Sequence, residues 1–204
     1  MSVKVKICGV MSSEDAAAAL ALGADAIGLN FCAQSPRALT ISQAHKITRG
    51  LPPGACVVGV FTNAPRDRVA AIARGVGLTA LQFHGDEPPE DCLGWEEFVV
   101  IKALSAEEPE QLAARAARYA VKYVLVDTAS ATYGGSGRTF DWRIAAAIPR
   151  DRLVVAGGLT PENVAEAVRT LRPLAVDVAS GVEQSPGRKD HEKLKAFIEA
   201  AKAA

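Results

Sequence analysis

The sequence predicts an α/β fold: a single (β/α)8 TIM barrel, compact and with short helices, that spans residues 1–204 as one domain. Short apolar runs alternate with Ala-rich helical runs along the whole chain, and eight such units can be counted. Strict alternation implies right-handed crossovers and a parallel sheet, and eight units close most simply into a barrel. No linker, low-complexity segment or charge run divides the chain.

The predicted strands are apolar runs of four to eight residues, often rich in Val, as buried parallel strands tend to be. They are Val3–Ile7, Ala26–Phe31, Cys56–Phe61, Ala80–Phe83, Phe98–Ala103, Tyr123–Val126, Leu153–Ala156 and Ala175–Val178. The predicted helices are Ser13–Leu22, Ser42–Arg49, Pro65–Arg74, Glu108–Tyr119, Pro161–Arg169 and Asp190–Ala201, with weaker connectors at Asp91–Trp95 and Trp142–Ile148.

An open doubly wound sheet is the rival architecture. It usually has fewer strands and a GxGxxG turn after the first strand, whereas Cys8-Gly9-Val10-Met11 follows the first strand here. The chain has 204 residues, close to the lower limit of about 200 for the barrel. We therefore expect short helices and few insertions.

Composition and charge argue against several classes of partner. Hydrophobic residues make up 49% of the chain and charged residues 23%, which is ordinary for a globular protein with a substantial core. Lys plus Arg equals Asp plus Glu at 23 each. We expect no nucleic acid and no membrane surface as partner, since both usually require a basic excess. The sequence shows no signal segment and no apolar run long enough to span a bilayer.

The cysteines are widely spaced and form no CxxC pair; they are Cys8, Cys32, Cys56 and Cys92. With only three histidines in the chain, we expect no metal site. Reduced thiols in a cytoplasmic protein are the natural interpretation.

The first predicted strand carries Lys6 and Cys8 on one face, because side chains alternate along a strand. The other face holds Val5 and Ile7, which must meet the surrounding helices, so Lys6 and Cys8 should point into the barrel. A buried structural cysteine is the commoner case in proteins. The position of Cys8 at the C-terminal strand end, where barrel active sites lie, favours a functional role instead.

Three more polar residues follow strand ends. Arg37 lies in the loop after the second strand, where a lone arginine is usually a solvated charge. His84 shares a face with Gln82 at the end of the fourth strand, and could be an acid–base group or a hydrogen-bonding wall. Asp127 ends the sixth strand and is a candidate general acid if burial raises its pKa; a capping or salt-bridged Asp is the alternative.

Glycine-rich loops follow the last three strands. Gly134, Gly135, Ser136 and Gly137 suggest a lid after the sixth strand, although any tight turn can use such a cluster. Gly157 and Gly158 follow the seventh strand, with Thr160 as a predicted N-cap and Pro161 at the first helical position. Ser180 and Gly181 follow the eighth strand. Glycines let backbone N–H groups approach an anion, and this pair of loops is a frequent phosphate site in barrels.

Taken together, the motifs resemble those of the phosphoribosylanthranilate isomerase family, barrel enzymes of tryptophan biosynthesis. Any one motif is unspecific, but they follow in order over nearly the whole chain. They are Lys6-Ile7-Cys8-Gly9, Gly23-Ala24-Asp25-Ala26-Ile27-Gly28, Ser35-Pro36-Arg37, Leu81-Gln82-Phe83-His84-Gly85, Val126-Asp127-Thr128, Gly134-Gly135-Ser136-Gly137, Phe140-Asp141-Trp142, Gly157-Gly158-Leu159, Pro161-Glu162-Asn163-Val164 and Asp177-Val178-Ala179-Ser180-Gly181-Val182-Glu183.

The resemblance implies a cofactor-independent Amadori rearrangement of N-(5'-phosphoribosyl)anthranilate to 1-(2-carboxyphenylamino)-1-deoxyribulose 5-phosphate. Carried over to this chain, Asp127 is the general acid and Cys8 the general base. The implied substrate-binding residues are Arg37, His84, Gly157, Gly158, Ser180 and Gly181. Arg37 is expected to hold the anthranilate carboxylate, and the glycine loops are expected to hold the phosphate.

A cysteine base must react as its thiolate, and a free cysteine with a pKa near ~8.5 is only slightly ionised at neutral pH. We expect Lys6 to stabilise this anion, with Asp177 on the last strand as the charge partner of Lys6. The expected binding partner is then a small phosphosugar substrate, and the chain is expected to be a monomer or a homodimer.

Other phosphosugar barrels are the alternatives: a ketose-phosphate epimerase, the related isomerase of histidine biosynthesis, or a form that acts on both isomerase substrates. A ketose-phosphate epimerase usually needs a metal site, which His45, His84 and His191 hardly permit. The related isomerase of histidine biosynthesis would be expected to have aspartates at both acid and base positions, and Cys8 argues against it. A non-enzymatic phosphate sensor would be favoured by the loss of Cys8 or Asp127, and both are present.

Overall fold

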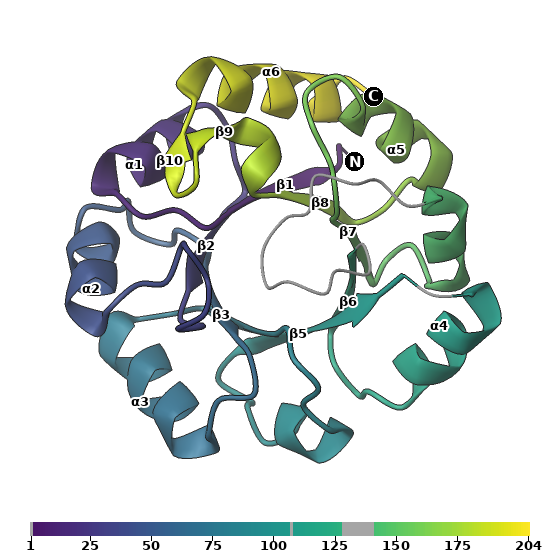
Figure 1. Ribbon diagram of the computed structural model, residues 1–204, viewed down its shortest axis with the longest axis horizontal. Coiled ribbons are helices and arrows are strands. Elements are labelled where there is room, and N and C mark those ends of the chain that lie inside the picture. The colour runs from purple at the N-terminus through teal and green to yellow at the C-terminus, as the bar shows by residue number, and fades with distance from the viewer. Residues whose placement is uncertain (1, 107, 128–140) are drawn as a thin grey trace.

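The computed structural model describes residues 2–106, 108–127 and 141–204, and it is a closed barrel of eight parallel strands (Figure 1). The strands are β1 Lys4–Cys8, β2 Ala26–Asn30, β3 Val57–Phe61, β4 Ala80–Phe83, β5 Val99–Ser105, β6 Tyr123–Asp127, β7 Leu153–Val155 and β8 Ala175–Val178. Neighbours in the sequence are neighbours in the barrel, and β1 pairs with β8 to close it. The predicted fold class is confirmed.

Helices surround the barrel as an outer ring in Figure 1. They are α1 Ser13–Ala21, α2 Ile41–Arg49, α3 Arg66–Val76, α4 Pro109–Ala117, α5 Val164–Leu171 and α6 His191–Lys202. The two weak connectors of the sequence are 3-10 helices, η1 Pro89–Cys92 and η2 Trp142–Ala147. A further 3-10 turn, η3 Ser180–Val182, leads into the short hairpin of β9 Glu183–Ser185 and β10 Arg188–Lys189, which the sequence did not predict.

Alternation along the strands divides the apolar residues into two clusters. The inner cluster fills the barrel and consists of Val58, Ala80, Ile101, Ala103, Leu125, Val154, Ala156 and Ala175. The larger cluster lies between barrel and helices and includes Val5 and Ile7, which are 1% and 0% exposed. The polar residues Lys6 and Cys8 are left facing inward, as the strand pattern predicted.

Most predicted strand ends lie within two residues of the observed ones, but the start of one helix was wrong. The sequence predicted Thr160 as N-cap with Pro161 at the first helical position, whereas α5 begins at Val164. The side chain of Asn163 accepts a hydrogen bond from the Thr160 N–H (2.8 Å) and donates one to the Gly158 carbonyl (2.9 Å). These two bonds hold residues 160–163 as a turn, and the helix starts only after it.

Within the described residues, no helix has the length and hydropathy needed to cross a membrane.

Candidate active site

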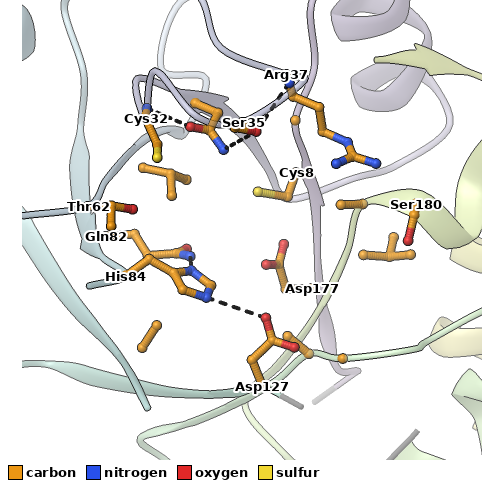
Figure 2. A pocket seen from close by; sticks show the side chains of 18 of the residues that line it. Cys8, Cys32, Ser35, Arg37, Thr62, Gln82, His84, Asp127, Asp177 and Ser180 are labelled. Atoms are coloured by element: carbon orange, nitrogen blue, oxygen red, sulfur yellow. Dashed lines mark hydrogen bonds and ion pairs between the residues drawn. The ribbon is translucent and has the colours of Figure 1, made fainter. Parts of the chain in front are cut away.

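A pocket of about 350 Å³ opens at the C-terminal ends of the strands (Figure 2). Cys8, Arg37, His84, Asp127 and Asp177 contribute side chains to its wall. Its lining also includes four residues of the predicted phosphate loops, namely Gly157, Gly158, Ser180 and Gly181. The structure therefore brings together every predicted catalytic and substrate-binding residue.

Cys8 comes from the end of β1, and its sulfur points into the pocket in Figure 2. Next to it, Lys6 forms a buried ion pair with Asp177, with 2.9 Å between Nζ and Oδ1. Lys6 and Asp177 are register partners on β1 and β8, so the predicted pairing is confirmed. Gly28 on β2 makes room for this group, because a Cβ there would lie 2.9 Å from Cys8 Sγ and 3.2 Å from Lys6 Cε.

The charges around Cys8 act on its acidity in opposite directions. Burial raises the pKa of the Cys8 thiol above its usual value, and the carboxylate of Asp177 adds to the rise. The ammonium groups of Lys6 and Lys189 oppose it. Burial disfavours the charge on Lys6, but Asp177 and Cys8 outweigh that effect and raise the pKa of Lys6. Lys6 is therefore a permanent cation beside the sulfur.

Asp127 ends β6 and faces the pocket beside His84 (Figure 2). Asp127 Oδ2 lies 3.4 Å from His84 Nε2, and the two side chains are about one-third exposed. The Gln82 amide nitrogen lies 2.9 Å from His84 Nδ1 and can only donate there. A neutral His84 then carries its proton on Nε2, facing the carboxylate of Asp127. The other amide atom, Gln82 Oε1, is buried and has no hydrogen-bond partner among the residues that the structure describes.

Arg37, from the loop after β2, is 6% exposed and is not the solvated charge that a lone loop arginine usually is. It donates from Nε to Glu183 Oε1 (2.8 Å) and from Nη2 to Glu183 Oε2 (2.6 Å). Glu183 in turn contacts the buried ammonium of Lys189 at 3.0 Å. No sequence motif points to Lys189, and Glu183 is only the last residue of the motif that follows the eighth strand.

The predicted phosphate loops approach each other closely. Gly157 and Gly158 have φ of 82° and 64°, in the left-handed region that favours glycine. A Cβ on Gly181 would collide with the carbonyl oxygen of Leu159, so only glycine lets the loop after β8 lie against the loop after β7. Both loops thus present bare backbone to the pocket.

A further buried ion pair, between Lys102 and Glu87, supports the β4 side of the pocket, and the sequence did not predict it. Lys102 of β5 donates to Glu87 Oε2 (2.7 Å) and to the carbonyl of Gly85 (2.6 Å). Glu87 also accepts from the N–H groups of Gly85 (2.9 Å) and Asn63 (2.7 Å). This network fixes the loop that directly follows His84.

The predicted lid, Gly134 to Gly137, lies outside the described residues. Among the residues that are described, no group of three or more His, Cys, Asp or Glu side chains could hold a metal ion.

Comparison with known proteins decides between the phosphosugar barrels. A family model described as N-(5'phosphoribosyl)anthranilate (PRA) isomerase matches residues 5–200. The chain belongs to this family. The resemblance predicted from the sequence motifs is thereby confirmed, together with the enzyme class.

Relatives of the family match over nearly their full lengths. The N-(5'-phosphoribosyl)anthranilate isomerase of Myxococcus xanthus is 50% identical over 209 residues, which cover 100% of this chain and 98% of that protein. The one from Pseudomonas fluorescens is 47% identical over 203 residues, with 98% and 99% covered.

Solved structures of the family share the barrel. The crystal structure from Thermotoga maritima is 43% identical with a TM-score of 0.90, and the match covers 99% of this chain and 100% of that chain. Another crystal structure of the isomerase, in complex with reduced 1-(o-carboxyphenylamino)-1-deoxyribulose 5-phosphate, is 40% identical with a TM-score of 0.85 and the same coverage. A further structure is of monomers generated from the dimeric Thermotoga maritima isomerase.

Proposed function

We propose that the pocket catalyses the Amadori rearrangement of N-(5'-phosphoribosyl)anthranilate to 1-(2-carboxyphenylamino)-1-deoxyribulose 5-phosphate, with Asp127 as general acid and Cys8 as general base. One observation carries the proposal: the thiol of Cys8 and the carboxylate of Asp127 enter the same pocket from β1 and β6 (Figure 2). Around them lie Arg37 and two glycine loops, which suit a substrate with one carboxylate and one phosphate.

The first step is opening of the furanose ring. Asp127 gives its proton to the ring oxygen, the bond from C1 to that oxygen breaks, and the anthranilate nitrogen forms a C=N bond to C1. Asp127 leaves this step as a carboxylate facing the Nε2–H of His84, 3.4 Å away. A hydrogen bond to a charged acceptor is stronger than one to a neutral acceptor. His84 therefore stabilises the carboxylate that forms as the ring opens.

The second step is removal of the proton from C2. The thiolate of Cys8 takes the proton, the electron pair forms the C1=C2 bond, and the C=N electrons return to nitrogen. The resulting enol-amine tautomerises to the ketone. C2 is oxidised as C1 is reduced, so the reaction is an isomerisation without net redox change. Because burial raises the pKa of Cys8, the Lys6 ammonium is needed to keep part of the thiol ionised.

Binding follows the charges of the pocket wall. We assign the anthranilate carboxylate to Arg37, whose planar guanidinium matches a planar anion. We assign the phosphate to the backbone of Gly158, Ser180 and Gly181, where glycine allows the closest approach. The chemistry described uses only groups of this chain and the substrate, with no cofactor.

The remaining expectations complete the proposal. We infer that residues 1–204 act as one catalytic domain, in the cytoplasm, as a monomer or a homodimer. The four cysteines are free, as a reducing compartment requires. Sedimentation of the purified chain distinguishes the two oligomeric states.

The test is turnover of N-(5'-phosphoribosyl)anthranilate, generated in situ and followed by the loss of its fluorescence. Cys8→Ser and Asp127→Asn should each lower kcat by about 100- to 10,000-fold, the usual contribution of a general acid or base. Glu97→Gln, which alters an exposed ion pair with Arg74, should keep full activity. A variant that retains wild-type kcat would remove that residue from the mechanism. An inactive wild type that phosphate still protects against heat would contradict the reaction itself.

A further inference from the structure

The contacts of Arg37 use only one edge of its guanidinium. Nε and Nη2 donate to the two oxygens of Glu183, at 2.8 and 2.6 Å. An arginine carries five N–H donors in a rigid plane. The second edge, formed by Nη1 and the other Nη2 hydrogen, can therefore still donate to a ligand. No described residue accepts a hydrogen bond from Nη1, and the side chain lines the pocket. Arg37 therefore binds one carboxylate, that of Glu183, and can bind a second one with its other edge.

Glu183 is itself held by Lys189. The side chain of Lys189 is 0% exposed, and its ammonium donates to Glu183 Oε1 (3.0 Å), to the carbonyl of Cys8 (2.6 Å) and to the carbonyl of Ala179 (3.0 Å). These three acceptors satisfy all three of its donors. One cation thus ties Glu183 to the end of β1, which carries the proposed base, and to the residue that follows β8.

Gly9 supplies the space for the arginine. It has a φ of 68°, and a Cβ at this position would collide with Cδ of Arg37. The stem of Arg37 therefore crosses the backbone directly after Cys8. Its own N–H is held by Ser35 Oγ at 3.2 Å. The position of the guanidinium is therefore set by Gly9 along the aliphatic stem, by Ser35 at the backbone N–H and by Glu183 at Nε and Nη2.

The charges of the cluster leave one positive charge for a ligand. Arg37 and Lys189 are cations and Glu183 is an anion, and all three are at most 7% exposed. Burial opposes the ionisation of Glu183, but Arg37 and Lys189 outweigh it and hold its pKa below the usual range. A single carboxylate on the pocket side completes the balance, because a buried charge without a partner is costly.

We infer that Glu183 and Lys189 are positioning residues for recognition of the substrate carboxylate: Lys189 holds Glu183, and Glu183 holds Arg37 with its free edge toward the pocket. This inference depends on the proposed function, which gives Arg37 the anthranilate carboxylate as its ligand. Selectivity for a ring that carries a carboxylate then depends on the Glu183–Arg37 contact, although Glu183 itself does not touch the substrate.

The expected consequence of removing Glu183 is a selective loss of affinity. A free arginine side chain retains its rotamers, and ordering it on binding lowers affinity by about 10- to 30-fold. Only a ligand that uses the guanidinium bears this cost. Loss of Glu183 should therefore weaken a ligand with the ring carboxylate and leave one without it nearly unchanged.

The experiment measures Kd by calorimetry for two ligands: reduced 1-(2-carboxyphenylamino)-1-deoxyribulose 5-phosphate, and the same compound without the carboxylate. Glu183→Gln should raise Kd for the first by at least about 10-fold and for the second by less than about twofold. In the Arg37→Met background it should change neither. Glu97→Gln is the matched control, because Glu97 also accepts from Nε and Nη2 of one arginine but lies on the surface.

Equal losses for both ligands, or no loss, would overturn the inference and leave the proposed function standing. A wild type that binds neither ligand would overturn the proposed function instead. If Glu183→Gln does not fold, Glu183→Asp keeps the charge opposite Lys189 but shortens the reach to Arg37. It should then show the same selective loss at a smaller size, and equal affinities for the wild type and Glu183→Asp would contradict the inference.

Discussion

Glu87→Gln tests whether the buried ion pair beside the pocket holds the loop after β4. The carboxylate of Glu87 is 4% exposed and accepts three hydrogen bonds, from the backbone of Asn63 (2.7 Å) and Gly85 (2.9 Å) and from Lys102 Nζ (2.7 Å). A glutamine keeps one acceptor oxygen but turns an NH2 group toward donors. It also removes the carboxylate that pairs with Lys102, a residue that is 1% exposed.

The expected loss of stability is large for a single isosteric change. Breaking a buried ion pair from one side costs about 3–5 kcal/mol. For a domain of this size each kcal/mol lowers Tm by about 2–4 °C, so Tm should fall by about 6–20 °C. Guanidinium unfolding, followed by tryptophan fluorescence, gives the free energy of unfolding directly.

Glu97→Gln is again the control, because the Arg74–Glu97 pair has the same short distance (2.6 Å) but side chains that are 63% and 54% exposed. An exposed pair contributes at most about 1 kcal/mol. If Glu87→Gln lowers the free energy of unfolding by no more than Glu97→Gln does, the reasoning from burial is refuted.

Two further predictions concern the pocket. Because the base acts as a thiolate, kcat/KM should rise with pH through the pKa of Cys8. Lys6→Met removes a cation that lowers this pKa, so the ascending limb of the pH–rate profile should move to higher pH. A limb that does not move would contradict the role of Lys6. Gly181→Ala places a Cβ against the carbonyl of Leu159 and should force the two phosphate loops apart. Its KM should rise about 10-fold or more, and inorganic phosphate should inhibit it less strongly than the wild type; an unchanged KM would show that these loops do not hold the phosphate.

Strand geometry explains why the Lys6, Cys8 and Asp177 side of the site could be predicted from the sequence. Lys6 and Cys8 alternate with buried Val5 and Ile7, so their inward direction follows from the strand itself. Asp177 is the register partner of Lys6 on β8, and a barrel that closes in sequence order brings these two strands together. The predicted start of α5 was wrong because the hydrogen bonds of the Asn163 side chain depend on the path of its loop.

The other ion pairs around the pocket could not be predicted in the same way. Arg37 and Glu183 are 146 positions apart. Arg37 lies in a turn and Glu183 begins β9, a short strand that the sequence did not predict, so no strand pattern indicated the direction of either side chain. Lys102 lies on β5 next to inward-facing Ile101 and Ala103, so parity turns it outward, toward the helices. A charged residue there contradicts the usual apolar pattern, and only the neighbouring loop with Glu87 explains it.

These buried pairs are better explained by the positions they fix than by stability. Replacing a buried ion pair with apolar side chains of similar volume is often neutral or stabilising, so stability alone gives no reason to keep charges at the pocket rim. An apolar side chain cannot hold a carbonyl, however. Lys189 holds the carbonyls of Cys8 and Ala179, and Lys102 holds that of Gly85. The two lysines thus fix the backbone next to the proposed base, the phosphate loop and His84, which are the points where a small displacement would separate the substrate from its acid and its base.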